Sequence, residues 1–169
     1  MADIPAKESV VTQGAVLFIF GATGDLARRK LFPAIYSLYR EGKLAEDFAV
    51  IGVARRPRTE EEFRNDLYAS IQEFSRYKAE NDQEWQAFAE HFEYKSLDIN
   101  NVEGFHELRQ QTESIESKFN IPGNRLFYLA LAPELFGSVS KSLKDGGMMD
   151  GKGWNRLVIE KPFGYNLES

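Results

Sequence analysis

A doubly wound α/β fold, built on a mostly parallel sheet, is the architecture that two features of the sequence predict. Short apolar stretches, typical of strands buried on both faces, alternate with longer segments whose apolar residues recur at helical spacing. The first apolar stretch also runs directly into a glycine-containing turn, after which a helical pattern continues. Strands that alternate with helices form parallel sheets, and ligands of such sheets lie at the carboxyl ends of the strands.

Five strands are expected, at residues 16–20, 49–54, 92–97, 126–130 and 157–159. In the first helical interval, Pro33 lacks an N–H and clashes with the preceding turn of a continuous helix. We therefore expect a short turn through Lys30, followed by a new helix with Pro33 in its first turn. The face of that helix expected to be buried consists of Leu31, Ala34, Ile35 and Leu38, and Gly42 is the expected C-cap.

The later helices have recognisable starts. Thr59 with Glu62 forms a capping box, and the same spacing recurs in Asn81 with Glu84 and in Asn100 with Glu103. A last helix is expected to begin near Pro133. The apolar residues expected to be buried by the three longer helices are Phe63, Leu67, Ile71 and Phe74; Val102, Phe105, Leu108, Ile115 and Phe119; and Leu135, Phe136, Val139 and Leu143.

Composition indicates one soluble domain. With 169 residues and 43% apolar content, the chain can bury one sizeable core, and we assign residues 1–14 to a flexible leader and residues 15–169 to the domain. The net charge of −5 disfavours nucleic acid and anionic membranes as partners. The chain has no cysteine, which excludes disulfides, thiolate catalysis and cysteine-ligated zinc and fits a cytoplasmic protein. No metal site is expected.

The turn after the first strand is the main candidate binding site. Its sequence is Gly21-Ala22-Thr23-Gly24-Asp25-Leu26. A glycine turn between a strand and a helix directs backbone N–H groups and the helix dipole at one point, where a phosphate or diphosphate binds favourably. The spacing differs from the common G-x-G-x-x-G fingerprint, so an ordinary strand–turn–helix corner is the alternative.

Arg55 follows the second strand and indicates which dinucleotide binds. Sites specific for NAD carry an acidic residue there for the ribose hydroxyls, whereas an arginine accommodates the 2′-phosphate of NADP. Here no Asp or Glu ends the strand, and Arg55 and Arg56 follow it at once. The sequence therefore favours NADP, and a solvated basic loop is the alternative.

A second candidate site is the turn Glu160-Lys161-Pro162-Phe163-Gly164 after the last strand. Lys161 could hold an anionic or hydroxylated substrate there, and the Lys161–Pro162 peptide could be cis. From sequence spacing alone, an ordinary turn that ends the strand and carries an exposed lysine is the favoured interpretation.

Read together, these segments resemble the glucose-6-phosphate dehydrogenase family. The resemblance rests on G-x-x-G-D-L-A at 21–27, on Arg55, on the strands that contain 124–130 and 154–159, and on E-K-P-F-G at 160–164. It extends in order from about Val16 to Ser169. It implies a Rossmann-type NADP-binding domain of an enzyme that transfers hydride from C1 of glucose 6-phosphate to NADP and forms 6-phosphogluconolactone, in the pentose phosphate route.

Carried over by position, the resemblance implies a role for each site residue. The coenzyme would contact Gly21, Ala22, Thr23, Gly24, Asp25 and Leu26, with Arg55 on the 2′-phosphate, Asp98 and Ile99 beside the adenine, and Ala130 near the nicotinamide. Lys161 would contact both coenzyme and substrate, and Lys30 would reach toward glucose 6-phosphate.

One family element does not occur before Ser169: the general-base histidine, which belongs to a larger C-terminal α+β domain. His91 and His106 lie in helical contexts, so we expect both to be structural or surface residues. We therefore interpret the chain as the coenzyme-binding part of such an enzyme, expected to bind NADP with little turnover. The parent enzyme would be a homo-oligomer through the missing domain.

Three other interpretations remain. A non-catalytic NADP-binding redox sensor would need no base. A short-chain or extended reductase needs Tyr-x-x-x-Lys, and Tyr39 with Lys43 match that spacing at the end of the first helix, away from the strand ends. A simple α/β domain without ligand is the third.

Overall fold

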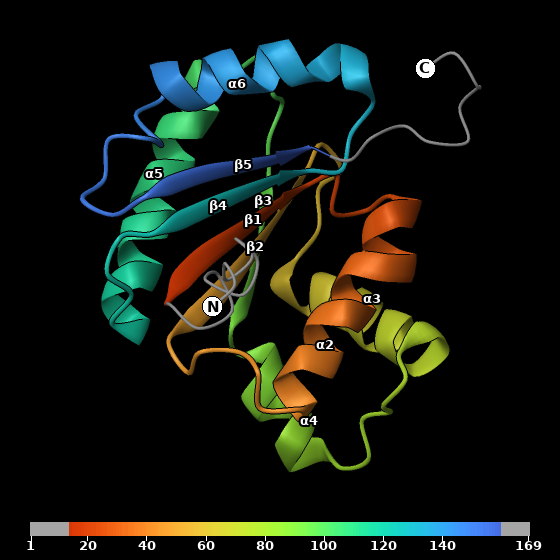
Figure 1. Cartoon of the computed structure of the whole chain (residues 1–169). Coiled ribbons are helices and arrows are strands. Elements are labelled where there is room, and N and C mark those ends of the chain that lie inside the picture. Colours follow the sequence, from red (N-terminus) through yellow and green to blue (C-terminus); the bar gives the residue numbers. More distant parts are fainter. Residues whose placement is uncertain (1–13, 160–169) are drawn as a thin grey trace, which may run out of the picture.

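A computed structural model describes residues 14–159 of the chain. Its five strands form one parallel sheet in the order β3-β2-β1-β4-β5 (Figure 1). The strands are β1 (Ala15–Phe20), β2 (Phe48–Ala54), β3 (Phe92–Ser96), β4 (Arg125–Leu129) and β5 (Asn155–Ile159). The expected fold class is confirmed.

Helices cover both faces of the sheet. One layer contains the π-helical turn η1 (Ala27–Leu31), α2 (Phe32–Arg40), α3 (Glu60–Phe74) and α4 (Asp82–Ala89). The other contains α5 (Val102–Phe119), the 3-10 turn η2 (Pro133–Leu135) and α6 (Phe136–Asp145) (Figure 1). Among the described residues, none of these helices has the length and apolarity needed to cross a membrane.

Alternating strand residues divide the core into two clusters. Ile19 and Val50 pack with the α2–α4 layer, whereas Phe18, Ile51 and Phe127 pack with the α5–α6 layer. The rings of Phe18 and Phe127 stack with centroids 4.8 Å apart on adjacent strands. This two-sided burial is why the central strands β1, β2 and β4 read as largely continuous apolar runs in the sequence.

The expectation for Pro33 is confirmed in part. A new helix, α2, begins at Phe32 with Pro33 in its first turn, but the short turn before it is the π-helical η1, and the chain stays helical from residue 25 to residue 40. The Phe32 N–H donates to the carbonyl of Ala27, five residues back. The wider turn accommodates the proline ring, which would clash with the carbonyl four residues before it in a regular α-helix.

The buried face of α2 also differs from the prediction. Ile35 is buried as expected, but Ala34 is exposed, and Leu31 and Leu38 are only partly buried. Phe32, Pro33 and Tyr36 take their places in the core. The π turn rotates the helix relative to a regular 3.6-residue pattern, which is the period that the prediction assumed. Gly42 follows the C-cap Glu41 with φ of 71°.

The predicted helix starts are correct for α3 and α4. Thr59 and Glu62 form a reciprocal capping box, and the Asn81 side chain accepts from the Glu84 N–H. For α5 the predicted cap is wrong by one residue, because Asn101 rather than Asn100 accepts from the Glu103 N–H. Consequently Val102 occupies the exposed first turn instead of the core.

Candidate functional site: the carboxyl ends of β1, β2, β3 and β4

The glycine corner lies where the strand order of the sheet changes direction, between β1 and β4 (Figure 1). The N–H groups of Gly21 and Ala22 donate to the Val53 carbonyl at 2.8 and 3.2 Å, and the Ala130 N–H donates to the Phe20 carbonyl at 2.9 Å. These bonds join the ends of β1, β2 and β4. Ligands of open α/β sheets bind at such a switch point.

Position 21 requires glycine for two reasons, its backbone angle and a close neighbouring carbonyl. Its φ is +94°, and a Cβ built on it would lie 2.2 Å from the carbonyl oxygen of Ala130. A side chain at position 21 would clash with that carbonyl, so glycine is what allows the ends of β1 and β4 to approach this closely. The close approach keeps the corner at the tips of the two strands, where ligands of such sheets bind.

The rest of the corner leads into a helix. The backbone N–H of Gly24 donates to the Gly21 carbonyl at 3.0 Å, and the backbone N–H of Arg28 donates to the Gly24 carbonyl at 3.1 Å. Gly24 and Asp25 are exposed, whereas Thr23 and Leu26 are partly exposed. The first turn of a helix leaves N–H groups without acceptors inside the helix, so an anion is favoured at this point.

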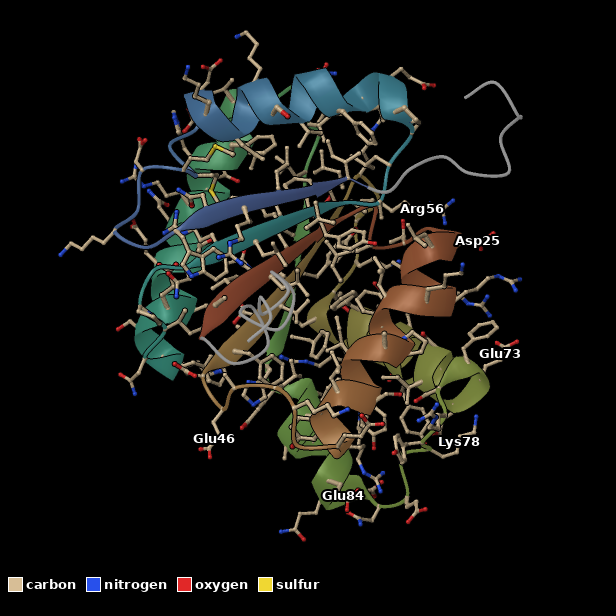
Figure 2. The ribbon with its side chains drawn as sticks, viewed as in Figure 1. Asp25, Glu46, Arg56, Glu73, Lys78 and Glu84 are labelled. Atoms are coloured by element: carbon tan, nitrogen blue, oxygen red, sulfur yellow. The ribbon has the colours of Figure 1, made fainter. Side chains whose placement is uncertain are left out.

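Arg55 lies in the exposed loop directly after β2, two residues beyond the carbonyl that holds Gly21 and Ala22. Arg56, in the same loop, and Asp25, at the start of the helix, lie at the same end of the sheet (Figure 2). The structure thus brings the Arg55 loop and the glycine corner to adjoining strand ends.

The Arg55 loop is held by β3. Ser96 Oγ donates to the Arg55 carbonyl at 3.1 Å, and the Tyr94 hydroxyl donates to the Arg56 carbonyl at 2.5 Å. Burial raises the pKa of the Tyr94 hydroxyl, which therefore stays protonated as a donor. The sequence did not predict the role of Tyr94 or Ser96, because each donates to a loop about 40 residues away in the chain. The one signal that could have identified them is their position in the middle and at the end of a strand beside the Arg55 loop.

Asp98 and Ile99 follow β3, one strand further from the corner. The Leu97 N–H donates to the Ala54 carbonyl at 2.8 Å, which joins the ends of β3 and β2. Asp98 Oδ1 accepts from the Asn100 N–H at 2.9 Å, and Ser142 Oγ donates to the Ile99 carbonyl at 2.7 Å. These bonds fix the backbone at the position expected for an adenine.

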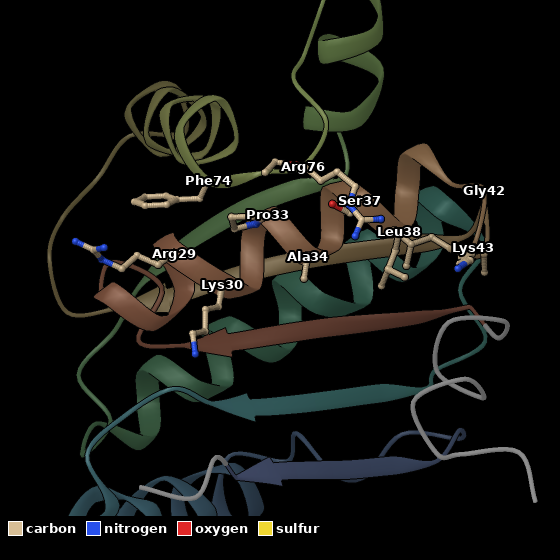
Figure 3. A pocket seen from close by; sticks show the side chains of 13 residues that line it. Arg29, Lys30, Pro33, Ala34, Ser37, Leu38, Gly42, Lys43, Phe74 and Arg76 are labelled. Atoms are coloured by element: carbon tan, nitrogen blue, oxygen red, sulfur yellow. The ribbon is translucent and has the colours of Figure 1, made fainter. Parts of the chain in front are cut away.

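Lys30 is exposed and borders a groove of about 1070 Å³ on the outer side of η1 and α2 (Figure 3). The groove also contains cations from Arg29, Lys43 and Arg76 and an apolar floor that includes Pro33 and Leu38. Lys30 lies toward the end of the groove that is nearer the tip of β1 (Figure 3). Lys161, the other predicted substrate residue, lies outside the described residues.

Two residues that could have suggested other chemistry, Tyr39 and His91, are structural. The Tyr39 ring packs 4.9 Å from Phe88 in the core, so Tyr39 and Lys43 do not form a reductase pair at the strand ends. The His91 ring lies between Phe48 and Phe119, at centroid distances of 4.1 and 4.6 Å. Within residues 14–159, no cluster of three or more His, Asp or Glu residues could hold a metal ion.

Comparison with known proteins agrees with this geometry. Residues 18–169 match the family described as "Glucose-6-phosphate dehydrogenase, NAD binding domain". The chain is 46% identical over 155 residues to glucose-6-phosphate 1-dehydrogenase of Bacillus subtilis, covering 92% of this chain and 30% of that one. It is 41% identical over 150 residues to the Leuconostoc mesenteroides enzyme, again covering 30% of it.

A solved structure titled "Glucose-6-phosphate dehydrogenase in complex with its substrate glucose-6-phosphate" superposes with a TM-score of 0.79 at 34% identity, over 94% of this chain and 32% of that one. The chain thus spans about a third of the length of these relatives. The parallel sheet, the glycine corner at its switch point and the family match lead to one conclusion: the chain belongs to the glucose-6-phosphate dehydrogenase family and forms its NAD(P)-binding domain.

Proposed function

We propose that this domain binds NADP, with the diphosphate at the glycine corner and the 2′-phosphate on Arg55. The observation that carries the proposal is the pair of hydrogen bonds from Gly21 and Ala22 to Val53, which places the corner beside the start of the Arg55 loop. A guanidinium binds a phosphate through two parallel hydrogen bonds, each strengthened by charge.

The residues present fit this coenzyme. Glycine at position 21 lets the ends of β1 and β4 approach closely, since a Cβ there would clash with the Ala130 carbonyl. The corner thereby stays at the switch point of the sheet, where a diphosphate would meet the first turn of the following helix. We assign Thr23, Gly24, Asp25 and Leu26 to the same contact. Asp98 and Ile99, at the end of β3, would lie beside the adenine, and Ala130 would lie beside the nicotinamide.

The proposed reaction is that of the family: NADP, when bound, accepts hydride from C1 of glucose 6-phosphate. Lys30 would attract the substrate's phosphate, and Lys161 would contact both ligands. Because the chain spans about a third of its relatives, we expect the isolated chain to bind coenzyme with little turnover. Assembly into a homo-oligomer and a cytoplasmic location are part of the same proposal.

Calorimetric titration tests the proposal. NADP should bind with one site per chain and more tightly than NAD, and glucose 6-phosphate should be titrated next into the NADP-saturated chain. Failure of NADP to bind would contradict the proposal. Binding of NADP with no response to glucose 6-phosphate would leave the coenzyme assignment intact and favour a domain without its own substrate affinity.

A further inference from the structure

Pro33 leaves one backbone carbonyl of the π-helical turn without its usual donor. In this turn the Phe32 N–H donates to Ala27, five residues back. By the same spacing the carbonyl of Arg28 would accept from residue 33, but proline has no N–H. A carbonyl that lacks a helical partner and is covered by a neighbouring helix needs another donor.

Ser70 of α3 supplies that donor. Its hydroxyl donates to the Arg28 carbonyl at 2.5 Å across 42 residues of sequence, and the residue is 1% exposed. A serine in the middle of a helix commonly bonds to its own helix or to water. Here the buried hydroxyl instead joins α3 to the turn that follows the glycine corner.

The charged contacts between α3 and this turn, by contrast, lie at the surface. Arg28 pairs with Glu73 at 2.9 Å, and the guanidinium groups of Arg28 and Arg29 lie 5.1 and 5.2 Å from the centroid of the Phe74 ring. Arg29 and Phe74 lie beside each other in Figure 3. The side chains of Arg28 and Glu73 are about half exposed, and ion pairs at such exposure contribute little to folding stability. Ser70 is the buried polar link.

This link connects the two halves of the proposed coenzyme site. On one side, the Arg28 N–H donates to Gly24 of the glycine corner at 3.1 Å. On the other side, α3 begins at the Thr59 capping box, directly after the loop that carries Arg55. The bond from Ser70 to Arg28 therefore ties the helix after the Arg55 loop to the helix after the corner.

We propose that Ser70 is a positioning residue, which sets the separation between the diphosphate corner and Arg55 and so supports the preference for NADP over NAD. This inference rests on the proposed NADP binding. NADP needs both halves of the site at a fixed separation, whereas NAD has no 2′-phosphate and depends less on Arg55.

The first test measures both coenzymes on the purified chain. In Ser70→Ala, the dissociation constant for NADP should rise about fivefold and that for NAD less than about twofold, as for the loss of one hydrogen bond. Thr112→Val is the matched control, since it removes a buried hydroxyl that donates to the Leu108 carbonyl inside α5, in the other layer. Equal losses for both coenzymes in Ser70→Ala, or the same change in the ratio in Thr112→Val, would overturn the proposal.

The second test is a double-mutant cycle with Pro33→Ala, which restores an N–H to the turn. Ser70→Ala should raise the unfolding equilibrium constant about tenfold in the parent chain but less than about threefold beside Pro33→Ala. Additive effects would show that the hydroxyl does not replace the missing N–H, and would overturn the inference. This cycle needs no ligand, so it separates failure of the inference from failure of NADP to bind.

Discussion

The 2′-phosphate of NADP requires a cation at the tip of β2, and Arg55 is the side chain proposed to supply it. In Arg55→Ala, we expect the dissociation constant for NADP to rise about 10- to 100-fold, because a hydrogen bond to a charged group contributes about 1.5–3 kcal/mol. The constant for NAD should change little. Calorimetry with both coenzymes checks this.

Arg76→Ala is the matched control, because Arg76 is an exposed cation paired with Glu41 at 3.6 Å beyond the end of α3. An equal loss of NADP affinity in this variant would mean that general positive charge, and not the position of Arg55, attracts the coenzyme.

Gly21 should tolerate no side chain. Its φ of +94°, and the Ala130 carbonyl that occupies the space a Cβ would need, predict that Gly21→Ala lowers the free energy of unfolding by at least about 2 kcal/mol. Gly137→Ala, on α6 with no atom within 4 Å of the position of its Cβ, should instead raise stability by about 0.5–1 kcal/mol. Urea unfolding of both variants measures the contrast, and similar stabilities would refute this account of the corner.

At the scale of elements, a buried ion pair joins α5 to β4. Arg125, 2% exposed, donates to both carboxylate oxygens of Glu116 at 2.9 and 3.0 Å and to the Met148 carbonyl at 2.8 Å. Glu116→Ala leaves the guanidinium buried and uncompensated, so it should cost about 3–5 kcal/mol of unfolding free energy.

The exposed pair of Arg109 and Glu113, at 3.1 Å on the same helix, is the control. Glu113→Ala should change stability by less than about 1 kcal/mol in the same urea experiment. If Glu116→Ala fails to fold, the double variant Glu116→Leu with Arg125→Met should recover a folded chain. A Glu116→Ala variant as stable as Glu113→Ala would contradict the assigned role of the pair.

The elements that the sequence predicted correctly are those set by local rules. The central strands β1, β2 and β4 follow from largely continuous apolar runs, and the starts of α3 and α4 follow from paired cap residues three positions apart. The continuity of the helix between η1 and α2 could not be predicted in this way, because the donor to the Arg28 carbonyl belongs to Ser70, 42 residues after Arg28. The register of apolar residues on α2 was wrong because the prediction assumed a regular helical period, which the π turn η1 changes.

The general location of the candidate site could be predicted, because the topology of the sheet determines it. Parallel strands place the residues that follow them at one edge, so Gly21 and Arg55 were expected to lie close together there. Asp98 and Ala130 were expected at the same edge from the family resemblance. What holds the Arg55 loop was not predictable, since Tyr94 and Ser96 bond to its backbone from the neighbouring strand β3, about 40 residues further along the chain.

At the scale of the whole molecule, His91 makes stability depend on pH. Burial lowers the pKa of His91, although its Nδ1 lies 2.7 Å from the Phe48 carbonyl oxygen. Below about pH 6.5 the unfolded chain binds a proton that the folded chain does not, so stability should fall as pH drops from there toward the lowered pKa.

Urea unfolding at about pH 7.5 and 5.5 measures this effect. His91→Gln should reduce the difference in unfolding free energy between the two pH values. It should also lower stability at both, because the stacking of the ring on Phe48 and Phe119 is lost. An unchanged dependence on pH in His91→Gln would assign the effect to other groups.

We propose above that one coenzyme, NADP, binds across the ends of adjoining strands. A titration of the isotope-labelled chain with NADP, followed through its backbone amide NMR signals, tests it most directly. The account predicts shifts centred on Gly21, Gly24, Arg55 and Ala130, with little change at Lys43 and Arg76 in the outer groove. Shifts confined to that groove, or no shifts at saturating NADP, would contradict it.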